Sequence, residues 1–202
     1  MYRIVAFTGA GISKASGIPT FAEMGDLREK LSRDYFNRYT EDFYRILNQM
    51  RRTCDQAKPN PAHLAIARYD VPVVTMNIDG LHKRAGSTNI VEIHGCLDYL
   101  YCDCCQKRYS YDVLEESIYC KSCHEKLQPN VVLYGDNIPL YSEAAKLVTN
   151  TKELLVIGTS FYTSTSWIFT NMAEAKGAKI TLINESAETK VPEYLKQIFE
   201  GK

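Results

Sequence analysis

The sequence predicts an α/β fold in which a mostly parallel sheet carries helices on both faces. Short runs that are apolar throughout alternate with segments of helical spacing, a pattern typical of strands buried on both sides. Residues 96–130 interrupt this alternation, because they are rich in cysteine and tyrosine and contain short strands at most. A chain of 202 residues therefore suits one main domain with a small insert.

Six apolar runs are the expected strands: residues 2–7, 71–77, 90–95, 131–135, 153–160 and 178–184. The segments between them place apolar residues at helical spacing. Helices are expected within residues 26–52, which contain no Gly or Pro, and over 62–69, 143–150 and 166–177. This order of elements predicts a Rossmann-like domain.

The composition argues against several classes of protein. The 24 basic and 24 acidic residues balance, so no overall field attracts nucleic acid or an anionic membrane. No apolar stretch approaches the roughly 18–20 residues that span a bilayer, and the N-terminal residues do not match a signal peptide. We expect a cytoplasmic protein that binds neither membranes nor nucleic acid directly, and we leave its oligomeric state open.

Five of the seven cysteines fall between residues 102 and 123, which points to a metal rather than to disulfides. Two Cys-x2-Cys pairs stand 14 residues apart, the spacing of a zinc ribbon. We therefore predict one structural Zn²⁺ held by Cys102, Cys105, Cys120 and Cys123. Cys104 could compete as a ligand but has the poorer spacing, and Cys54 and Cys96 are interpreted as small apolar residues.

A glycine-rich loop, "TGAGISKASGIPTFAE" at residues 8–23, follows the first run. It matches neither the dinucleotide fingerprint nor the P-loop, so alone it is explained equally well as a tight turn without a ligand. The segments "GTS" (158–160) and "NES" (184–186) also follow expected strands. Because the carboxyl ends of parallel strands form the crevice where nucleotides bind, three such ends together predict a nucleotide site.

Polar residues follow two further strands. Asn77 and Asp79 bracket Ile78 after the second run, although an Asx-type turn explains these residues equally well in isolation. His94 ends the third run just before the insert, where a general base would face a bound nucleotide. His63 and His82 are interpreted as structural helix residues.

With these pieces in order, the chain resembles the sirtuin family of NAD-dependent protein deacylases. The matching motifs are "GAGIS..SGIP.F" (9–21), "PN.AH" (59–63), "T.NID.LH..AG" (75–86), "HG" (94–95), the two Cys-x2-Cys pairs, "P.VV.YG" (129–135), "GTS" (158–160) and "INE" (183–185). They occur in the family's order over almost the whole chain.

The resemblance implies that several loops bind NAD. The pyrophosphate would be cradled by Gly9, Ala10, Gly11 and Ser13, and phosphate and ribose would be contacted by Gly158, Thr159 and Ser160. The adenosine ribose would be held by Asn184 and Glu185, and the exposed ribosyl carbon would be shielded by Phe21. The nicotinamide carboxamide would be bound by Ile78 and Asp79, with Asn77 ordering the ribose or a nearby water.

The resemblance also implies the reaction. The oxygen of an acyl-lysine attacks the anomeric carbon, nicotinamide departs, and His94 deprotonates a ribose hydroxyl, so that the acyl group passes to ADP-ribose. An acylated protein or peptide would pair as an added β-strand with a segment that includes Val132, Leu133, Tyr134 and Gly135, and with Phe161. Asn77 and Asp79 would act with His94 in catalysis.

The implied domain division is discontinuous. Residues 1–24, 59–95 and 131–202 would form the Rossmann-like NAD-binding domain. A helical cofactor-loop segment, residues 25–58, would join the zinc-ribbon insert, residues 96–130, in a small domain.

The chain departs from the family at a few positions. Thr20 and Ala22 stand where Asp and Arg flank the phenylalanine, Met76 stands for Gln, and Gln128 stands for Arg. The tyrosine/arginine pair of desuccinylase-type members is not evident, so a neutral acyl group is favoured. Two alternatives remain open: an ADP-ribosyltransferase or NAD hydrolase, and a binding module for NAD or ADP-ribose with little catalysis.

Overall fold

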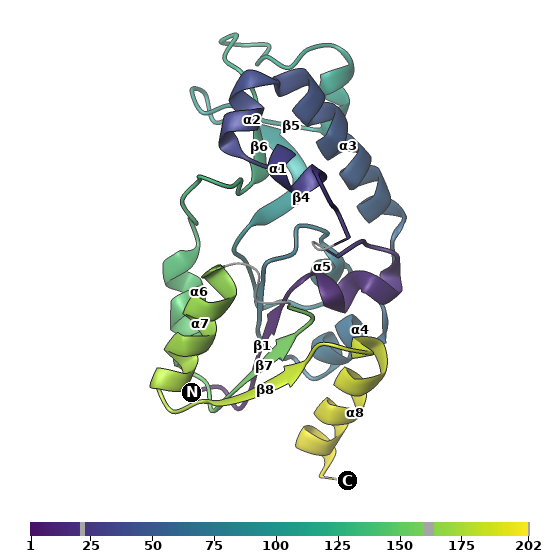
Figure 1. The fold of residues 1–202 in the computed structure, drawn as a ribbon, viewed down its shortest axis with the longest axis vertical. Coiled ribbons are helices and arrows are strands. Elements are labelled where there is room, and N and C mark those ends of the chain that lie inside the picture. Colours follow the sequence, from purple (N-terminus) through teal and green to yellow (C-terminus); the bar gives the residue numbers. More distant parts are fainter. Residues whose placement is uncertain (21–22, 160–163, 202) are drawn as a thin grey trace.

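The computed structural model describes residues 1–20, 23–159 and 164–201 of the chain. Figure 1 shows an elongated molecule in which a sheet with flanking helices carries both termini, and a smaller module of helices and short strands lies at the opposite end. Phe21, Ala22, Ser160 and Phe161, all named in the sequence analysis, lie outside the described residues.

A parallel sheet organises the larger part. In the described part of the chain it has five strands in the order β3-β2-β1-β7-β8, and every neighbouring pair is parallel. The strands are β1 (Val5–Thr8), β2 (Val73–Thr75), β3 (Ile90–Glu92), β7 (Glu153–Ile157) and β8 (Lys179–Ile183). The prediction of a mostly parallel sheet is confirmed, and five of the six expected strands belong to it.

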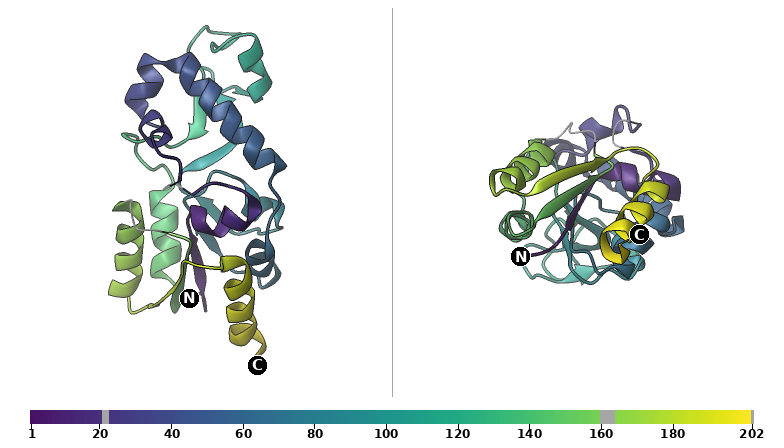
Figure 2. Two further views of the ribbon diagram at one scale, coloured as in Figure 1. Left: turned by 45° about the vertical axis from the view of Figure 1, so that its right-hand side comes forward. Right: turned by 90° about the horizontal axis from the view of Figure 1, so that it is seen from below.

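Helices cover both faces of this sheet, as Figure 2 shows from below. One face packs against α4 (Pro61–Arg68) and α8 (Ala187–Glu200), and the other against α6 (Tyr141–Thr149) and α7 (Ser164–Ala175). Alternate residues of β1 point to opposite faces of the sheet. Ala6 packs in the core under α4 and α8, and Val5 and Phe7 pack in the core under α6 and α7. Burial on both sides explains why these strands are continuous apolar runs.

The expected strand at residues 131–135 is not part of the parallel sheet. Residues Gln128–Val131 form β6, which pairs antiparallel with β4 (Gly95–Tyr101) in a second sheet completed by β5 (Arg108–Tyr109). The chain enters the insert along β4 and leaves it along β6, which pairs with β4. It then reaches the cleft between the two parts of the molecule, and the prediction of a strand over residues 131–135 was wrong in its sheet and its bounds.

The expected helical segment 26–52 is broken into three helices: α1 (Leu27–Lys30), α2 (Arg33–Arg38) and α3 (Thr40–Gln56). The first break falls at Ser32, which is extended and whose hydroxyl accepts a hydrogen bond from the N–H of Tyr35, as an N-cap does. α3 buries Phe43, Tyr44 and Leu47 in a core shared with the cysteine-rich insert. This common core supports the grouping of residues 25–58 and 96–130 that we propose.

The remaining elements are short. The loop after β1 forms a 3₁₀ helix, η1 (Ala10–Ser16), α5 (Leu81–Arg84) follows β2, and η2 (Tyr111–Glu115) lies in the insert. No helix in the described part of the chain has the length and apolar character that crossing a membrane requires.

Candidate active site

The two glycine loops at the carboxyl ends of β1 and β7 touch through their backbones. The N–H of Gly11 donates to the carbonyl of Gly158 at 2.8 Å, and a Cβ on Gly11 would stand 2.6 Å from the Cα of Gly158. Gly158 itself has φ +62°, and its own Cβ would lie 2.2 Å from the amide nitrogen of Ile12. These two glycines are therefore required by loop-to-loop packing, whatever ligand the loops hold.

A cavity of about 700 Å³ opens between the two parts of the molecule, beside these loops. Many of the predicted site residues line it: Gly9, Ala10, Gly11, Asn77, Ile78, Asp79, His94, Val132, Leu133, Tyr134, Gly135, Gly158, Thr159 and Asn184. The structure thus brings together residues from six separate stretches of the sequence. A volume of this size suits a small-molecule site.

Ser13 is fully buried and lies beneath the cavity rather than among its lining residues. Its hydroxyl donates to Asp79 Oδ2 at 2.7 Å and lies 3.4 Å from His63 Nε2. The N–H of Asn60 donates to Nδ1 of His63, so the ring proton of the neutral histidine is on Nε2 and points at Ser13. Burial lowers the pKa of His63 to about 4, which keeps this ring neutral at pH 7.

Asp79 is held at both carboxylate oxygens. Oδ2 accepts the Ser13 hydroxyl, and Oδ1 accepts the N–H of Leu81 at 2.9 Å, at the start of α5. Asn77 is fixed as firmly: its Nδ2 lies 3.2 Å from both Gly9 O and Ser13 Oγ. Two polar side chains at the carboxyl end of β2 are thus preorganised at the cavity wall.

His94 lies just before β4, where the chain leaves the sheet for the insert. Its Nδ1 is 3.0 Å from the carbonyl oxygen of Met76. A carbonyl only accepts hydrogen bonds, so Nδ1 carries the proton of the neutral ring and Nε2 keeps its lone pair. Burial lowers the pKa of His94 despite the opposing hydrogen bond to Met76, so the neutral form dominates at pH 7.

Asn184 and Glu185 differ in their surroundings. The side-chain amide of Asn184 makes two hydrogen bonds with the backbone of Thr159, accepting from its N–H at 3.0 Å and donating to its C=O at 2.8 Å. Glu185 is exposed and is not among the residues that line the cavity. Asn184 therefore orders the second glycine loop, a connection that the sequence did not reveal.

The cavity also has an apolar wall that the sequence analysis did not assign to the site. From α3 it includes Leu47, Met50 and Cys54, and elsewhere it includes Ile18, Leu31 and Val131. Among the described residues that line the cavity there is no Lys or Arg. Helical spacing predicts that such residues are buried, but it cannot show that they face a ligand rather than a core.

Arg84 connects this wall to the polar side of the cavity. Its Nη2 donates to the carbonyl oxygens of Cys54 at 2.7 Å and Asp79 at 2.9 Å, and its Nη1 donates to that of Ala57 at 2.8 Å. These bonds cap the C-terminal end of α3, where backbone carbonyls have no partner within the helix. No local sequence pattern identifies such a residue.

The four predicted zinc ligands form a single cluster. Their sulfur atoms all lie within 4.8 Å of one another, with Cys102 and Cys123 3.3 Å apart and Cys105 and Cys120 3.6 Å apart. A tetrahedral Zn²⁺ with Zn–S bonds of about 2.3 Å needs sulfur–sulfur distances of about 3.8 Å, so the set fits zinc closely. Cys104 is exposed and outside the cluster.

The two cysteine turns have matching backbones. The residue after each pair, Gln106 or His124, has a left-handed conformation and donates its N–H to the carbonyl of the first cysteine of that pair, at 2.8 and 3.0 Å. His124 is therefore a turn residue beside the cluster. The turns place the sulfur atoms of both pairs toward one point.

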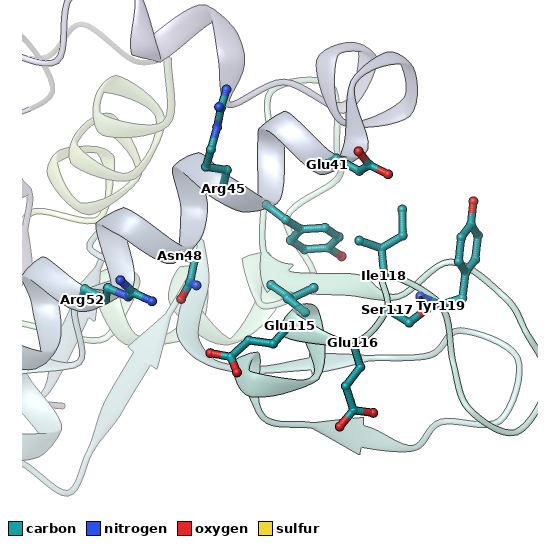
Figure 3. A pocket seen from close by; sticks show the side chains of 11 residues that line it. Glu41, Arg45, Asn48, Arg52, Glu115, Glu116, Ser117, Ile118 and Tyr119 are labelled. Carbon is teal, nitrogen blue, oxygen red and sulfur yellow. Dashed lines mark hydrogen bonds between the residues drawn. The ribbon is translucent and has the colours of Figure 1, made fainter.

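A second cavity, of about 520 Å³, lies between α3 and residues 114–119 (Figure 3). Its rim carries Arg45 and Arg52 from α3 and Glu115 and Glu116 from the opposite side. None of the predicted site residues lines it. We therefore place the candidate active site in the larger cavity.

Known proteins are similar to this chain in sequence and in fold. The model of the Sir2 family matches residues 9–164. The chain is 36% identical over 199 residues to an NAD-dependent protein deacetylase of Bacillus cereus, covering 91% of this chain and 82% of the relative. It is 32% identical over 198 residues to an NAD-dependent protein deacetylase of Thermotoga maritima, covering 89% and 80%.

Among solved structures, a Sir2 protein in complex with a p53 peptide and NAD⁺ superposes with a TM-score of 0.85. It is 31% identical, and the match covers 98% of this chain and 92% of that one. The glycine loops, the polar residues after β2 and the cysteine cluster all lie within the segment that the family model matches. This chain belongs to the Sir2 family.

Proposed function

We infer that this chain is an NAD-dependent protein lysine deacylase, which cleaves NAD to nicotinamide and transfers the acyl group from lysine to ADP-ribose. The observation that carries this inference is His94, a neutral histidine whose Nδ1 is held by the Met76 carbonyl in the wall of the cavity. Transfer of the acyl group requires a base at this place, whereas simple cleavage of NAD does not.

The residues of the cavity fit NAD. Gly9, Ala10 and Gly11 lie at the start of η1, where the first N–H groups of a helix suit a phosphate. The described lining has no Lys or Arg, and the N–H groups of Gly9 and Gly11 already donate to the carbonyls of Ile157 and Gly158. We therefore assign the N–H of Ala10 to the pyrophosphate, with the two glycines allowing its close approach to the backbone. When bound, NAD supplies the anomeric carbon that receives the acyl oxygen and the nicotinamide that leaves.

Asn77, Ile78 and Asp79 would hold the nicotinamide end. The carboxylate of Asp79 is fixed by the hydroxyl of Ser13 and the N–H of Leu81, so it meets a carboxamide without rearranging. Ile78 offers an apolar surface beside it. Preorganised groups of this kind favour one orientation of the bound base.

His94 would accept a proton at Nε2. The hydrogen bond from Nδ1 to Met76 fixes the tautomer, and burial lowers the pKa, so the lone pair on Nε2 is available near neutral pH. A base within hydrogen-bonding reach of a ribose hydroxyl contributes on the order of 10²–10⁴-fold to such a step.

The acylated peptide would add as a β-strand beside Val132, Leu133, Tyr134 and Gly135, all of which line the cavity. The apolar wall formed by Leu47, Met50 and Cys54 favours a neutral acyl chain, because an acidic one would be desolvated without a cation among the described lining residues. One Zn²⁺ bound by four thiolates leaves no open position and would be structural.

We place the protein in the cytoplasm, where free thiols persist and a four-cysteine zinc site is stable. An ADP-ribosyltransferase would use the same NAD site but would leave ADP-ribose on protein. Mass spectrometry of a reaction with NAD and an acetyl-lysine peptide separates the two. We expect O-acetyl-ADP-ribose in equal amounts with nicotinamide; an ADP-ribosylated protein with no deacylated peptide would contradict the deacylase.

A further inference from the structure

Arg33, at the start of α2, joins three separate stretches of the chain. Its Nε and Nη2 donate to the two carboxylate oxygens of Asp136 at 2.8 and 2.7 Å, and its Nη1 donates to Gln128 Oε1 at 2.8 Å. The guanidinium also lies 5.0 Å from the centroid of the Phe36 ring. All three donor atoms are used, in the paired geometry that makes arginine–carboxylate contacts specific.

The backbone of the same segment pairs with the proposed substrate segment. The N–H of Tyr134 donates to Leu31 O at 3.0 Å, and the N–H of Arg33 donates to Tyr134 O at 2.9 Å, a parallel bridge between Ser32 and Tyr134. This edge of residues 132–135 is therefore occupied within the chain. An incoming peptide strand cannot use the N–H and C=O of Tyr134 and has to pair with other backbone groups of this segment.

Asp136 in turn shapes the end of the substrate segment. Its Oδ2 accepts the N–H of Leu133 at 3.0 Å, and its own N–H donates to Leu133 O at 2.9 Å, which closes a turn around Gly135. Gly135 has φ +96°, and a Cβ there would lie 3.7 Å from Arg33 Cβ. Burial alone would raise the pKa of Asp136, but the hydrogen bonds from Arg33 and Leu133 keep it below its usual range.

We propose that Arg33 is a positioning residue for the acyl-peptide substrate: by holding Asp136, it fixes the turn around Gly135 beside which the peptide strand pairs. This rests on the proposed function. Arg33 is not among the residues that line the cavity, so it acts through Asp136 and the backbone of Tyr134.

The contact differs from an ordinary surface ion pair. The side chains of Arg33 and Asp136 are 30% and 20% exposed, and the pair is bidentate. Arg38, on the same helix, pairs with Asp34 with side chains that are 67% and 70% exposed. Exposed pairs of that kind contribute little, so Arg38→Ala is a matched control.

The test measures the Kd of a fluorescent acetyl-lysine peptide and, in the deacylation assay, separate KM values for peptide and NAD. Arg33→Ala is expected to raise the peptide Kd and KM on the order of tenfold, because misplaced binding groups cost affinity steeply, while the NAD KM changes little. Arg33→Lys, which keeps charge but not the paired geometry, is expected to lie between Arg33→Ala and wild type. Arg38→Ala is expected to match wild type.

A second measurement asks whether Arg33 acts through Asp136. The double variant Arg33→Ala/Asp136→Ala is expected to raise the peptide KM no further than Asp136→Ala alone, because Arg33 acts through the carboxylate that Asp136→Ala removes. An active wild type with an unchanged peptide KM in Arg33→Ala, equal rises in both KM values, or fully additive effects would overturn the inference. A wild type that binds NAD but deacylates no acyl-lysine peptide would instead refute the proposed function.

Discussion

Nδ1 of His94 lies 3.0 Å from the carbonyl oxygen of Met76, the residue that follows strand β2. The N–H of Met76 donates to the carbonyl of Thr8 at 2.9 Å, so the acceptor is itself anchored to the sheet. The candidate base is therefore oriented by the sheet, although it belongs to the segment that leads into the insert.

The orientation and burial of His94 predict the pH dependence of deacylation. A base works in its neutral form, so kcat/KM should fall at acid pH as His94 becomes protonated. Because burial lowers the pKa of His94, the midpoint of this fall should lie below the ordinary value of about 6.5. The pH profile of kcat/KM measures it; a midpoint above 7 would contradict the assignment.

Arg84 is expected to matter for both stability and NAD binding. Arg84→Met keeps the apolar stem but removes the hydrogen bonds to the carbonyls of Cys54, Ala57 and Asp79. This loss should lower the free energy of unfolding by about 1–2 kcal/mol. The effect stays small because Arg84 is exposed and water screens its charge. The NAD KM should rise, because α3 and Asp79 line the same cavity. Urea titration and NAD kinetics test this.

The control for Arg84 is Arg52→Met. Arg52 is also exposed and lies on α3 near its C-terminal end. Arg52→Met is expected to leave the free energy of unfolding and the NAD KM within error of wild type. Equal effects from both variants would show that the hydrogen bonds of Arg84 do not matter.

Buried His82 is expected to make the fold sensitive to acid. Burial lowers the pKa of His82 to about 3, whereas in the unfolded chain it is about 6.5. The unfolded state therefore binds more protons below pH 6.5, and stability falls as pH drops from 6.5 toward 3. At pH 5 this single group costs about 2 kcal/mol relative to pH 7.

The variant His82→Gln isolates that effect. Glutamine cannot take up the proton, so the loss of unfolding free energy between pH 7 and pH 5 should shrink by about 2 kcal/mol. Urea titrations at the two pH values give the difference directly, whatever the variant's absolute stability. An unchanged difference would mean that His82 is already protonated in the fold.

The cysteine cluster is expected to hold one zinc ion per chain that the small module needs for folding. The shared core includes Cys102 and Cys120, so loss of the metal should loosen the packing of α3 as well as the insert. Metal analysis and thermal melting of Cys120→Ser test this, with Cys104→Ser as control. A Cys120→Ser protein as stable as wild type would contradict a structural role.

The parallel sheet could be predicted from the sequence because strands buried on both faces are apolar throughout, as in β1 and β7. The fate of residues 131–135 could not, because apolar character does not distinguish a sheet strand from a segment that pairs with β4 and lines a cleft. The break at Ser32 likewise depends on pairing with Tyr134, about a hundred residues away in the chain.

The candidate site likewise has residues that the sequence predicts and partners that it does not. Asn77, Asp79 and His94 could be proposed because polar residues at strand ends are informative. The partners that orient them could not: the Met76 carbonyl is a backbone atom, and the hydrogen bonds of Arg33 to Asp136 span 103 positions. Such contacts follow from the tertiary arrangement and leave no periodic pattern.

The most direct test of the central claim compares two reactions in His94→Ala. If His94 acts after nicotinamide has left, the variant should still exchange labelled nicotinamide into NAD in the presence of an acetyl-lysine peptide. Its deacylation should fall on the order of 10²–10⁴-fold. A variant that deacylates at the wild-type rate would contradict the assignment of His94 as the base.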